Sequence, residues 1–205
     1  MAHVALIGAS GAAGSRIHQE LVRRGHTVTG IARSPEKIAA LPGTNAVRAD
    51  VYDAQALAQA LRGHDAAISA VHFTASDPQA LVDAVRASGV KRYLVVGGAG
   101  SLEVAPGQRL VDQPGFPAVY HAEASKGADF LGLLKASAQD LEWTFLSPSA
   151  LFVPGERTGV FRLGTDQLLT GADGQSRISF EDYAIALVDE LERPAHVRQR
   201  FTVGY

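Results

Sequence analysis

Residues 4–14 read Val-Ala-Leu-Ile-Gly-Ala-Ser-Gly-Ala-Ala-Gly, four apolar residues followed by glycines at every third position. The apolar run predicts a buried β-strand, and the glycines predict a tight turn into a helix. Gly8 allows the turn, Gly11 lets backbone N–H groups approach a phosphate, and Gly14 lets the helix pack on the strand. The alternative is a turn whose glycines serve only close packing. The predicted contacts of a dinucleotide pyrophosphate are Gly8, Ser10, Gly11, Ala12, Ala13 and Gly14.

The rest of the chain repeats the strand–helix alternation. Further strands are predicted at residues 27–32, 46–49, 66–71, 93–96, 143–146 and 201–203. Helices are predicted after Gly14, over residues 34–41, after Asp53, over 77–89, over 121–138 and after Ser179. This alternation predicts an α/β, Rossmann-like doubly wound fold, with a mainly parallel sheet and helices on both faces. Ligands of such sheets bind at the carboxyl ends of the strands, so the loops there are expected to face the site.

Composition narrows the classes of protein. The 205 residues, 46% of them hydrophobic, suit a single NAD(P)-binding domain over residues 1–205. A net charge of −2 and no basic stripe argue against nucleic-acid binding. The absence of cysteine excludes disulfides and thiolate chemistry, and the histidines show no paired metal-ligand spacing. With no signal peptide and no long apolar run, we expect a cytoplasmic protein that binds no membrane.

The residue that follows the second strand indicates whether the protein binds NAD(H) or NADP(H). An acid there would bind the ribose 2′-OH of NAD, whereas the chain has Arg33, whose guanidinium suits the 2′-phosphate of NADP(H). The alternative is a solvated arginine. Asp50 and Val51 are placed at the adenine, although Asp50 equally suits a turn. Val71 and His72 are placed near the nicotinamide ribose, with His72 either a proton donor or a solvated loop residue.

The usual catalytic pair of short-chain reductases is missing. That pair needs Tyr and Lys four apart on one helix face, and here Tyr120 and Lys126 are six apart. Tyr120 and Ser101 are the remaining candidates for catalytic residues, and Glu123 either orients a substrate or faces solvent. Without an acid, an acceptor that delocalises the incoming charge is favoured over an aliphatic ketone.

Three segments carry a family resemblance: VALIGASGAAGSRI, LEWTFLSPSALFVPGERTG and GQSRISFEDYAIALVDELERPAHVRQRFTVGY. The chain resembles the NADH-flavin reductase family of atypical, NmrA-like short-chain dehydrogenases/reductases, related in fold to biliverdin reductase B. The resemblance implies NAD(P)H binding, reduction of a flavin-like or other aromatic acceptor, and acceptor-side loops within residues 147–180. It places Ser147 and Pro148 by the nicotinamide. It also places four residues in the acceptor pocket: Phe152, Pro154, Glu156 and Arg157. Asp182 is expected to cap a helix.

The sequence therefore predicts an NADPH-dependent oxidoreductase that delivers hydride to a flavin, quinone or similar conjugated small molecule. NADP(H) is expected in preference to NAD(H), a flavin is a possible substrate, and no metal is expected. The partner is a small-molecule acceptor, and the chain is expected to be a monomer or a homodimer. The rival hypothesis is a redox sensor of NmrA-like type that binds NADP(H) without turnover.

Overall fold

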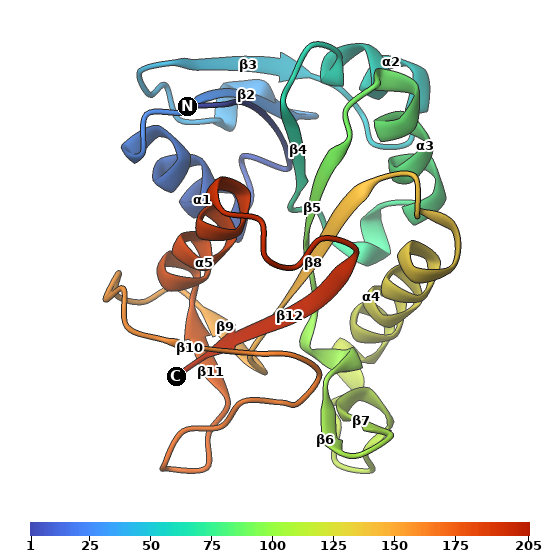
Figure 1. The fold of residues 1–205 in the computed structure, drawn as a ribbon, viewed down its shortest axis with the longest axis vertical. Coiled ribbons are helices and arrows are strands. Elements are labelled where there is room, and N and C mark those ends of the chain that lie inside the picture. Colours follow the sequence, from blue (N-terminus) through green and yellow to red (C-terminus); the bar gives the residue numbers. More distant parts are fainter.

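The computed structural model describes residues 1–205, and an eight-stranded sheet runs through its centre (Figure 1). The strand order is β10-β12-β8-β5-β4-β1-β2-β3. All neighbours pair in parallel except β10, which is antiparallel to β12. The predicted Rossmann-like α/β fold is confirmed. The strands are β1 (His3–Ile7), β2 (Thr27–Ala32), β3 (Thr44–Arg48), β4 (Ala66–Ser69), β5 (Arg92–Val96), β8 (Glu142–Pro148), β10 (Arg162–Gly164) and β12 (Gln199–Gly204).

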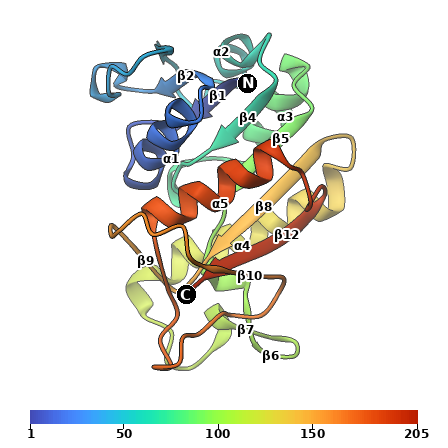
Figure 2. The ribbon, with the colours of Figure 1, turned by 60° about the vertical axis from the view of Figure 1, so that its left-hand side comes forward.

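Helices cover both faces of the sheet (Figures 1 and 2). On one face, α1 (Ala12–Arg23) packs on α5 (Phe180–Glu192); on the other lie α2 (Ala54–Leu61), α3 (Pro78–Ser88) and α4 (Ala118–Ser137). Each face has its own core of fully buried apolar side chains, with Leu21 and Leu187 in the first and Trp143 and Phe130 in the second. No helix is both long enough and apolar enough to cross a membrane.

The strand order diverges at β1, with β2 and β3 on one side of it and β4, β5, β8 and β12 on the other. β1 pairs with β2 on one side and with β4 on the other, so the helices that follow β1 and β4 lie on opposite faces. Between such diverging connections a crevice opens at the carboxyl ends of the strands. The glycine turn after β1 therefore lies in the crevice.

The predicted helix ends are confirmed where a side chain or glycine defines them. Asp53 accepts the N–H of Ala56, and Ser179 accepts the N–H of Asp182, which fixes the starts of α2 and α5. Gly25 follows α1 with a φ of +79°, a conformation that glycine adopts without strain.

Two helix predictions need correction. Residues 34–41 form only a 3-10 turn at Pro35–Lys37, because Pro42 disfavours a helical Leu41 and so short a helix is costly to nucleate. The helix predicted over residues 121–138 is α4, which begins at Ala118, three residues earlier than predicted and directly after Pro117.

Two long connections, residues 97–117 and 148–174, contain short strands that the sequence did not predict. They are β6 (Glu103–Ala105), β7 (Gln108–Arg109), β9 (Leu151–Val153) and β10, and β9 pairs with β11 (Arg177–Ser179) beyond the second connection. Strands of two or three residues are too short to show the alternation of apolar and polar residues on which strand prediction depends.

Candidate functional site

A cavity of about 550 Å³ opens at the carboxyl ends of the parallel strands. The loops that follow β1, β2, β3, β4, β5 and β8 all contribute to its wall, as the strand–helix pattern predicts. Of the fifteen residues predicted to bind the nucleotide or to act in catalysis, twelve line it: Gly8, Ser10, Gly11, Ala12, Ala13, Arg33, Asp50, Val51, Val71, His72, Tyr120 and Pro148.

The turn after β1 accepts only glycine at its first position. Gly8 has a φ of +83°, and its N–H donates to the carbonyl of Ile31 at 2.8 Å. A Cβ at Gly8 would lie 2.5 Å from the carbonyl oxygen of Ala70, on the neighbouring loop. Gly14 does not line the cavity; a Cβ there would clash with the carbonyl of Gly8. Gly14 thus permits helix packing, as predicted, while Gly8 shapes the cavity.

The N-terminus of α1 offers hydrogen-bond donors to the cavity. The N–H groups of Ala12 and Ala13 have no acceptor in the protein, and the capping residue Gly11 has no side chain to supply one. The first turn of α1 carries no acidic residue that would repel an anion. Unpaired N–H groups at a helix N-terminus attract phosphate. This end of the cavity therefore fits a pyrophosphate.

Arg33 and Asp50 lie at the ends of β2 and β3 and line the same part of the cavity. Arg33 is exposed and makes no ion pair or hydrogen bond, so its guanidinium is free to bind an anion. Asp50 accepts the N–H of Tyr52 at 3.0 Å, which closes the turn after β3. The turn-forming role considered for Asp50 is thus observed, and its carboxylate also faces the cavity.

The other end of the cavity is mostly apolar and aromatic. Phe152 from β9 packs edge-to-face on Phe180 at the start of α5, with ring centroids 4.5 Å apart. Pro148 and Tyr120 also line the wall here, and the Tyr120 side chain is exposed. Flat apolar walls of this kind favour a conjugated ring over a strongly polar ligand.

His72 and Glu123 meet at the rim of the cavity, although 50 residues separate them in sequence. Nδ1 of His72 lies 3.3 Å from Oε1 of Glu123. The Glu123 carboxylate also accepts the N–H groups of Phe73 and Thr74, at 2.8 and 2.9 Å. Partial burial alone would raise the pKa of Glu123, but the hydrogen bonds from Thr74 and Phe73 and the nearby His72 outweigh burial and lower it.

The structure does not bring Ser101 or Ser147 to the cavity. Ser101 is buried, and its hydroxyl lies 3.3 Å from Nη1 of Arg200. Ser147 is fully buried with its hydroxyl 3.5 Å from the same nitrogen. Arg200 in turn bonds Asp166, so these serines belong to a structural contact that joins β8, β12, the turn after β5 and the loop that follows β10. Lys126 is exposed and lies outside the cavity wall, consistent with the missing Tyr–Lys pair.

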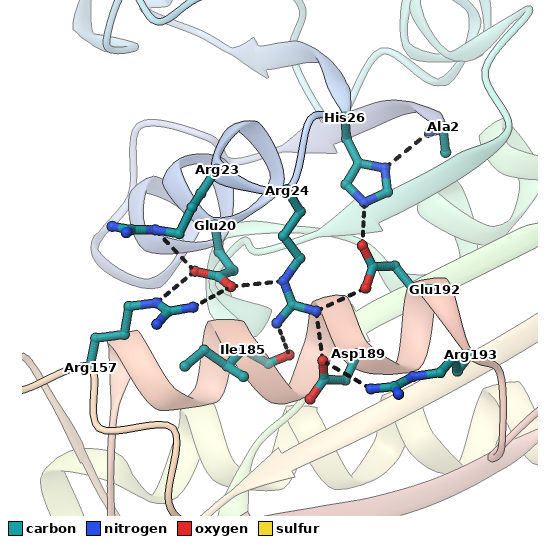
Figure 3. A network of polar contacts seen from close by, with 10 residues as sticks. All are labelled: Ala2, Glu20, Arg23, Arg24, His26, Arg157, Ile185, Asp189, Glu192 and Arg193. Carbon is teal, nitrogen blue, oxygen red and sulfur yellow. Dashed lines mark hydrogen bonds and ion pairs between the residues drawn. The ribbon is translucent and has the colours of Figure 1, made fainter.

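A network of charged side chains joins α1 to α5 (Figure 3). Glu20 is buried, and its carboxylate accepts from Arg24 at 2.8 Å and from Arg157 at 2.8 and 2.9 Å. Arg24 also bonds Asp189 and Glu192 on α5. Burial raises the pKa of Glu20, but the guanidinium groups of Arg157 and Arg24 outweigh it and lower the pKa. Glu20 therefore stays ionised at neutral pH.

This network changes the interpretation of the loop after β9. Arg157 binds Glu20 instead of lining the cavity, and Pro154 and Glu156 line a second, open hollow beside β9 and β11. Asp182 does not cap α5 with its side chain. Its carboxylate accepts from Thr158, Gly159 and Tyr205. Of the four residues that the resemblance placed in the acceptor pocket, only Phe152 lines the cavity.

Sequence reasoning missed several wall residues. Tyr52 follows directly after Val51 and could have been found by extending that loop by one residue. The residues Gly97, Gly98 and Phe180 carry no local signal that distinguishes a cavity wall from ordinary packing. The bonds of Glu123 to residues 72–74 depend on tertiary contact alone.

The model of a family described as NAD(P)H-binding matches residues 8–194, from the first glycine of the turn to the end of the last helix. The match therefore includes nearly every residue of the cavity wall.

Three solved structures are similar over almost the whole chain. A "putative exported protein" from Burkholderia pseudomallei is 48% identical, with a TM-score of 0.91 and 100% of both chains covered. A "putative epimerase" from Bacteroides thetaiotaomicron is 40% identical, with a TM-score of 0.94 and 99% of this chain and 96% of that chain covered. A "putative NADH-flavin reductase" from Streptococcus pneumoniae is 38% identical, with a TM-score of 0.84 and 100% of this chain and 99% of that chain covered. The third agrees with the resemblance found in the sequence.

Proposed function

The chain belongs to the NAD(P)H-binding family, and from this premise we propose that it is an NADPH-dependent reductase of conjugated small molecules such as flavins and quinones. One observation carries the proposal. A single cavity joins an anion-binding turn and the unpaired Arg33 to an apolar, aromatic end at β8, β9 and α5. Such a cavity suits a phosphorylated nucleotide at one end and a flat acceptor at the other.

The residues that would hold the nucleotide follow from their free hydrogen-bonding groups. Backbone N–H groups of Ala12 and Ala13 would bind the pyrophosphate, and Gly8 leaves the space for it. Arg33 would bind the 2′-phosphate by a charged hydrogen bond, which favours NADPH over NADH. Asp50, at the same end, would contact the adenosine.

At the other end, the chain orients the acceptor and excludes water. Phe152, Phe180 and Pro148 form the apolar surface on which a conjugated ring would lie. The bound nicotinamide supplies the hydride. Holding the acceptor close and correctly oriented would then provide much of the rate enhancement.

The experiment is a measurement of NADPH oxidation against flavins, quinones and linear tetrapyrroles, with NADH in parallel. We expect at least one acceptor to give saturable turnover, with a higher kcat/KM for NADPH than for NADH. Turnover with none of the acceptors, in protein shown by titration to bind NADPH, would overturn the proposal.

That same outcome would favour a second candidate, a redox sensor that binds NADP(H) without turnover. The observation in its favour is the position of Lys126, which is exposed and lies outside the cavity. Lys126 therefore does not form a catalytic pair with Tyr120. A sensor predicts different partner binding or thermal stability with the oxidised and the reduced nucleotide, in the absence of any acceptor.

A further inference from the structure

The cavity rim holds a histidine with a fixed carboxylate partner. His72 follows β4 and Glu123 lies on α4, one turn after Tyr120, and all three side chains line the cavity. Nδ1 of His72 is 3.3 Å from Oε1 of Glu123, while Nε2 has no partner in the protein. The His72 side chain is 84% exposed, so Nε2 is accessible to a bound ligand.

The partner of His72 is held in place by the protein. Glu123 accepts from the N–H groups of Phe73 and Thr74 and from the Thr74 hydroxyl at 2.7 Å. These bonds and His72 lower the pKa of Glu123, against the effect of burial, so that the carboxylate is ionised and only accepts hydrogen bonds. The bond between the two side chains therefore requires a proton on Nδ1 of His72. Donation from Nε2 then uses the imidazolium, in which both ring nitrogens carry a proton.

We propose that His72, oriented by Glu123, donates a proton from Nε2 to the carbonyl oxygen of the acceptor, and that the acceptor is a conjugated carbonyl compound such as a quinone or an enone. This inference rests on the proposed function and names its substrate class. It assigns the missing acid to the loop after β4 instead of the helix position that Tyr and Lys occupy in short-chain reductases.

The step balances in electrons and protons. The hydride from the reduced nicotinamide brings two electrons to a carbon of the conjugated system, and the double-bond electrons shift onto the carbonyl oxygen. That oxygen takes the proton from Nε2 of His72, which gives a neutral enol and an oxidised nucleotide. The enol formed from a quinone then tautomerises to the hydroquinone. His72 regains a proton from water at the open rim. A flavin has less need of this group, because its ring spreads the negative charge after hydride addition.

The other ionisable groups of the cavity are less suited to this role. Arg33, Asp50 and Tyr52 lie at the ends of β2 and β3, with the anion-binding turn. Glu123 is ionised and cannot donate. Tyr120 shares the rim with His72, but a free phenol is a much weaker acid than an imidazolium at neutral pH.

The first test observes the imidazole without any nucleotide or acceptor. In protein with ¹⁵N-labelled histidine, we expect neutral His72 to carry its proton on Nδ1. In Glu123→Gln the Nε2–H form that neutral imidazoles ordinarily prefer should gain population. Thr74→Ala removes one hydrogen bond to Glu123 but leaves its carboxylate, so it should keep the wild-type tautomer. A wild-type ring that is mainly Nε2–H would overturn the orientation by Glu123.

The second test measures kcat for a quinone, an enone and a flavin as the pH rises from 5 to 8. In His72→Gln, kcat for the quinone or the enone should fall at least tenfold, because general acid catalysis contributes about 10²–10⁴-fold. The wild-type decline of kcat as imidazole loses its proton should be absent in this variant. Flavin reduction should change less than twofold. His121→Gln is the matched control, since His121 is an exposed histidine on α4, the helix that carries Glu123, and does not line the cavity.

The outcomes separate this inference from the proposed function. Turnover of flavins alone, or a quinone kcat in His72→Gln above half the wild-type value, would overturn the role of His72 and leave the reductase in place. NADPH binding without turnover of any acceptor would overturn both.

Discussion

Charged side chains behave differently at the α1–α5 interface and at the cavity rim. At the interface, every charge of the network has a partner: Glu20 binds Arg24 and Arg157, and Arg24 also binds Asp189 and Glu192 (Figure 3). At the part of the rim beside the glycine turn, Arg33 has no partner, and the N–H groups of Ala12 and Ala13 have no acceptor. Elsewhere on the rim, His72 pairs with Glu123.

The difference separates groups that maintain the fold from groups that await a ligand. Buried polar groups that stabilise a fold are satisfied within it, because an unpaired buried donor or charge is costly. Groups left free at a cavity cost little while water solvates them, and they can bind an anion. Substitutions in the network should therefore lower stability, and substitutions at the rim should lower affinity.

The largest effect is expected from Glu20→Gln. The substitution removes the buried negative charge that Arg24 and Arg157 share, and the single amide oxygen of Gln replaces only part of their bonds. Breaking such a buried pair should lower the free energy of unfolding by about 3 kcal/mol. Urea unfolding at pH 7 measures this, and the affinity of the remaining folded protein for NADPH should stay within about twofold. A variant as stable as the wild type would mean that the network does not stabilise the α1–α5 contact.

Next in size is Arg33→Ala, which tests the rim. NADPH affinity should fall roughly 10- to 150-fold, because a hydrogen bond to a charged group contributes about 1.5–3 kcal/mol. NADH affinity and the free energy of unfolding should hardly change, since Arg33 has no partner in the protein. The matched control is Arg48→Ala, an exposed arginine on β3 that pairs with Glu36 and does not line the cavity. Equal losses for NADPH and NADH would remove Arg33 from phosphate recognition.

A smaller, pH-dependent effect should follow from the same network. Burial raises the pKa of Glu20, but the bonds from Arg157 and Arg24 outweigh burial and lower the pKa below the usual value of a glutamate. The contribution of Glu20 to stability is therefore full above that usual value and is lost as the pH falls through the lowered pKa. Urea unfolding between pH 7 and pH 3 should show wild type and Glu20→Gln converging below about pH 4.5. A constant difference across this range would contradict the ionised state of Glu20.

The smallest effect is expected from Glu36→Gln. Glu36 and Arg48 form an ion pair at 3.6 Å in which both side chains are mostly exposed. Exposed pairs contribute little, so the free energy of unfolding should change by less than about 0.5 kcal/mol. A loss of unfolding free energy as large as that expected for Glu20→Gln would show that burial does not explain the difference between the Glu36–Arg48 pair and the Glu20 network.

Much of the fold could be predicted from the sequence, since its signals are local. The run Val4–Ile7, the glycines of the turn, and the caps Asp53 and Ser179 each act within a few residues. The prediction failed at residues 34–41, where Pro42 outweighed the helical spacing of Ile38 and Leu41. It also missed β10, because an edge strand of three residues has too little pattern to detect.

The sequence by itself determined the strand–helix alternation, the glycine turn, the position of Arg33 after β2 and the absence of the Tyr–Lys pair. Each of these depends on residues near one another in the chain or on the fixed geometry of a parallel sheet. Only the tertiary structure decided that Ser101 turns to Arg200, that Arg157 binds Glu20 and that Glu123 holds His72. Those contacts join residues that are 51 to 137 positions apart, and their partners are chosen by packing and burial.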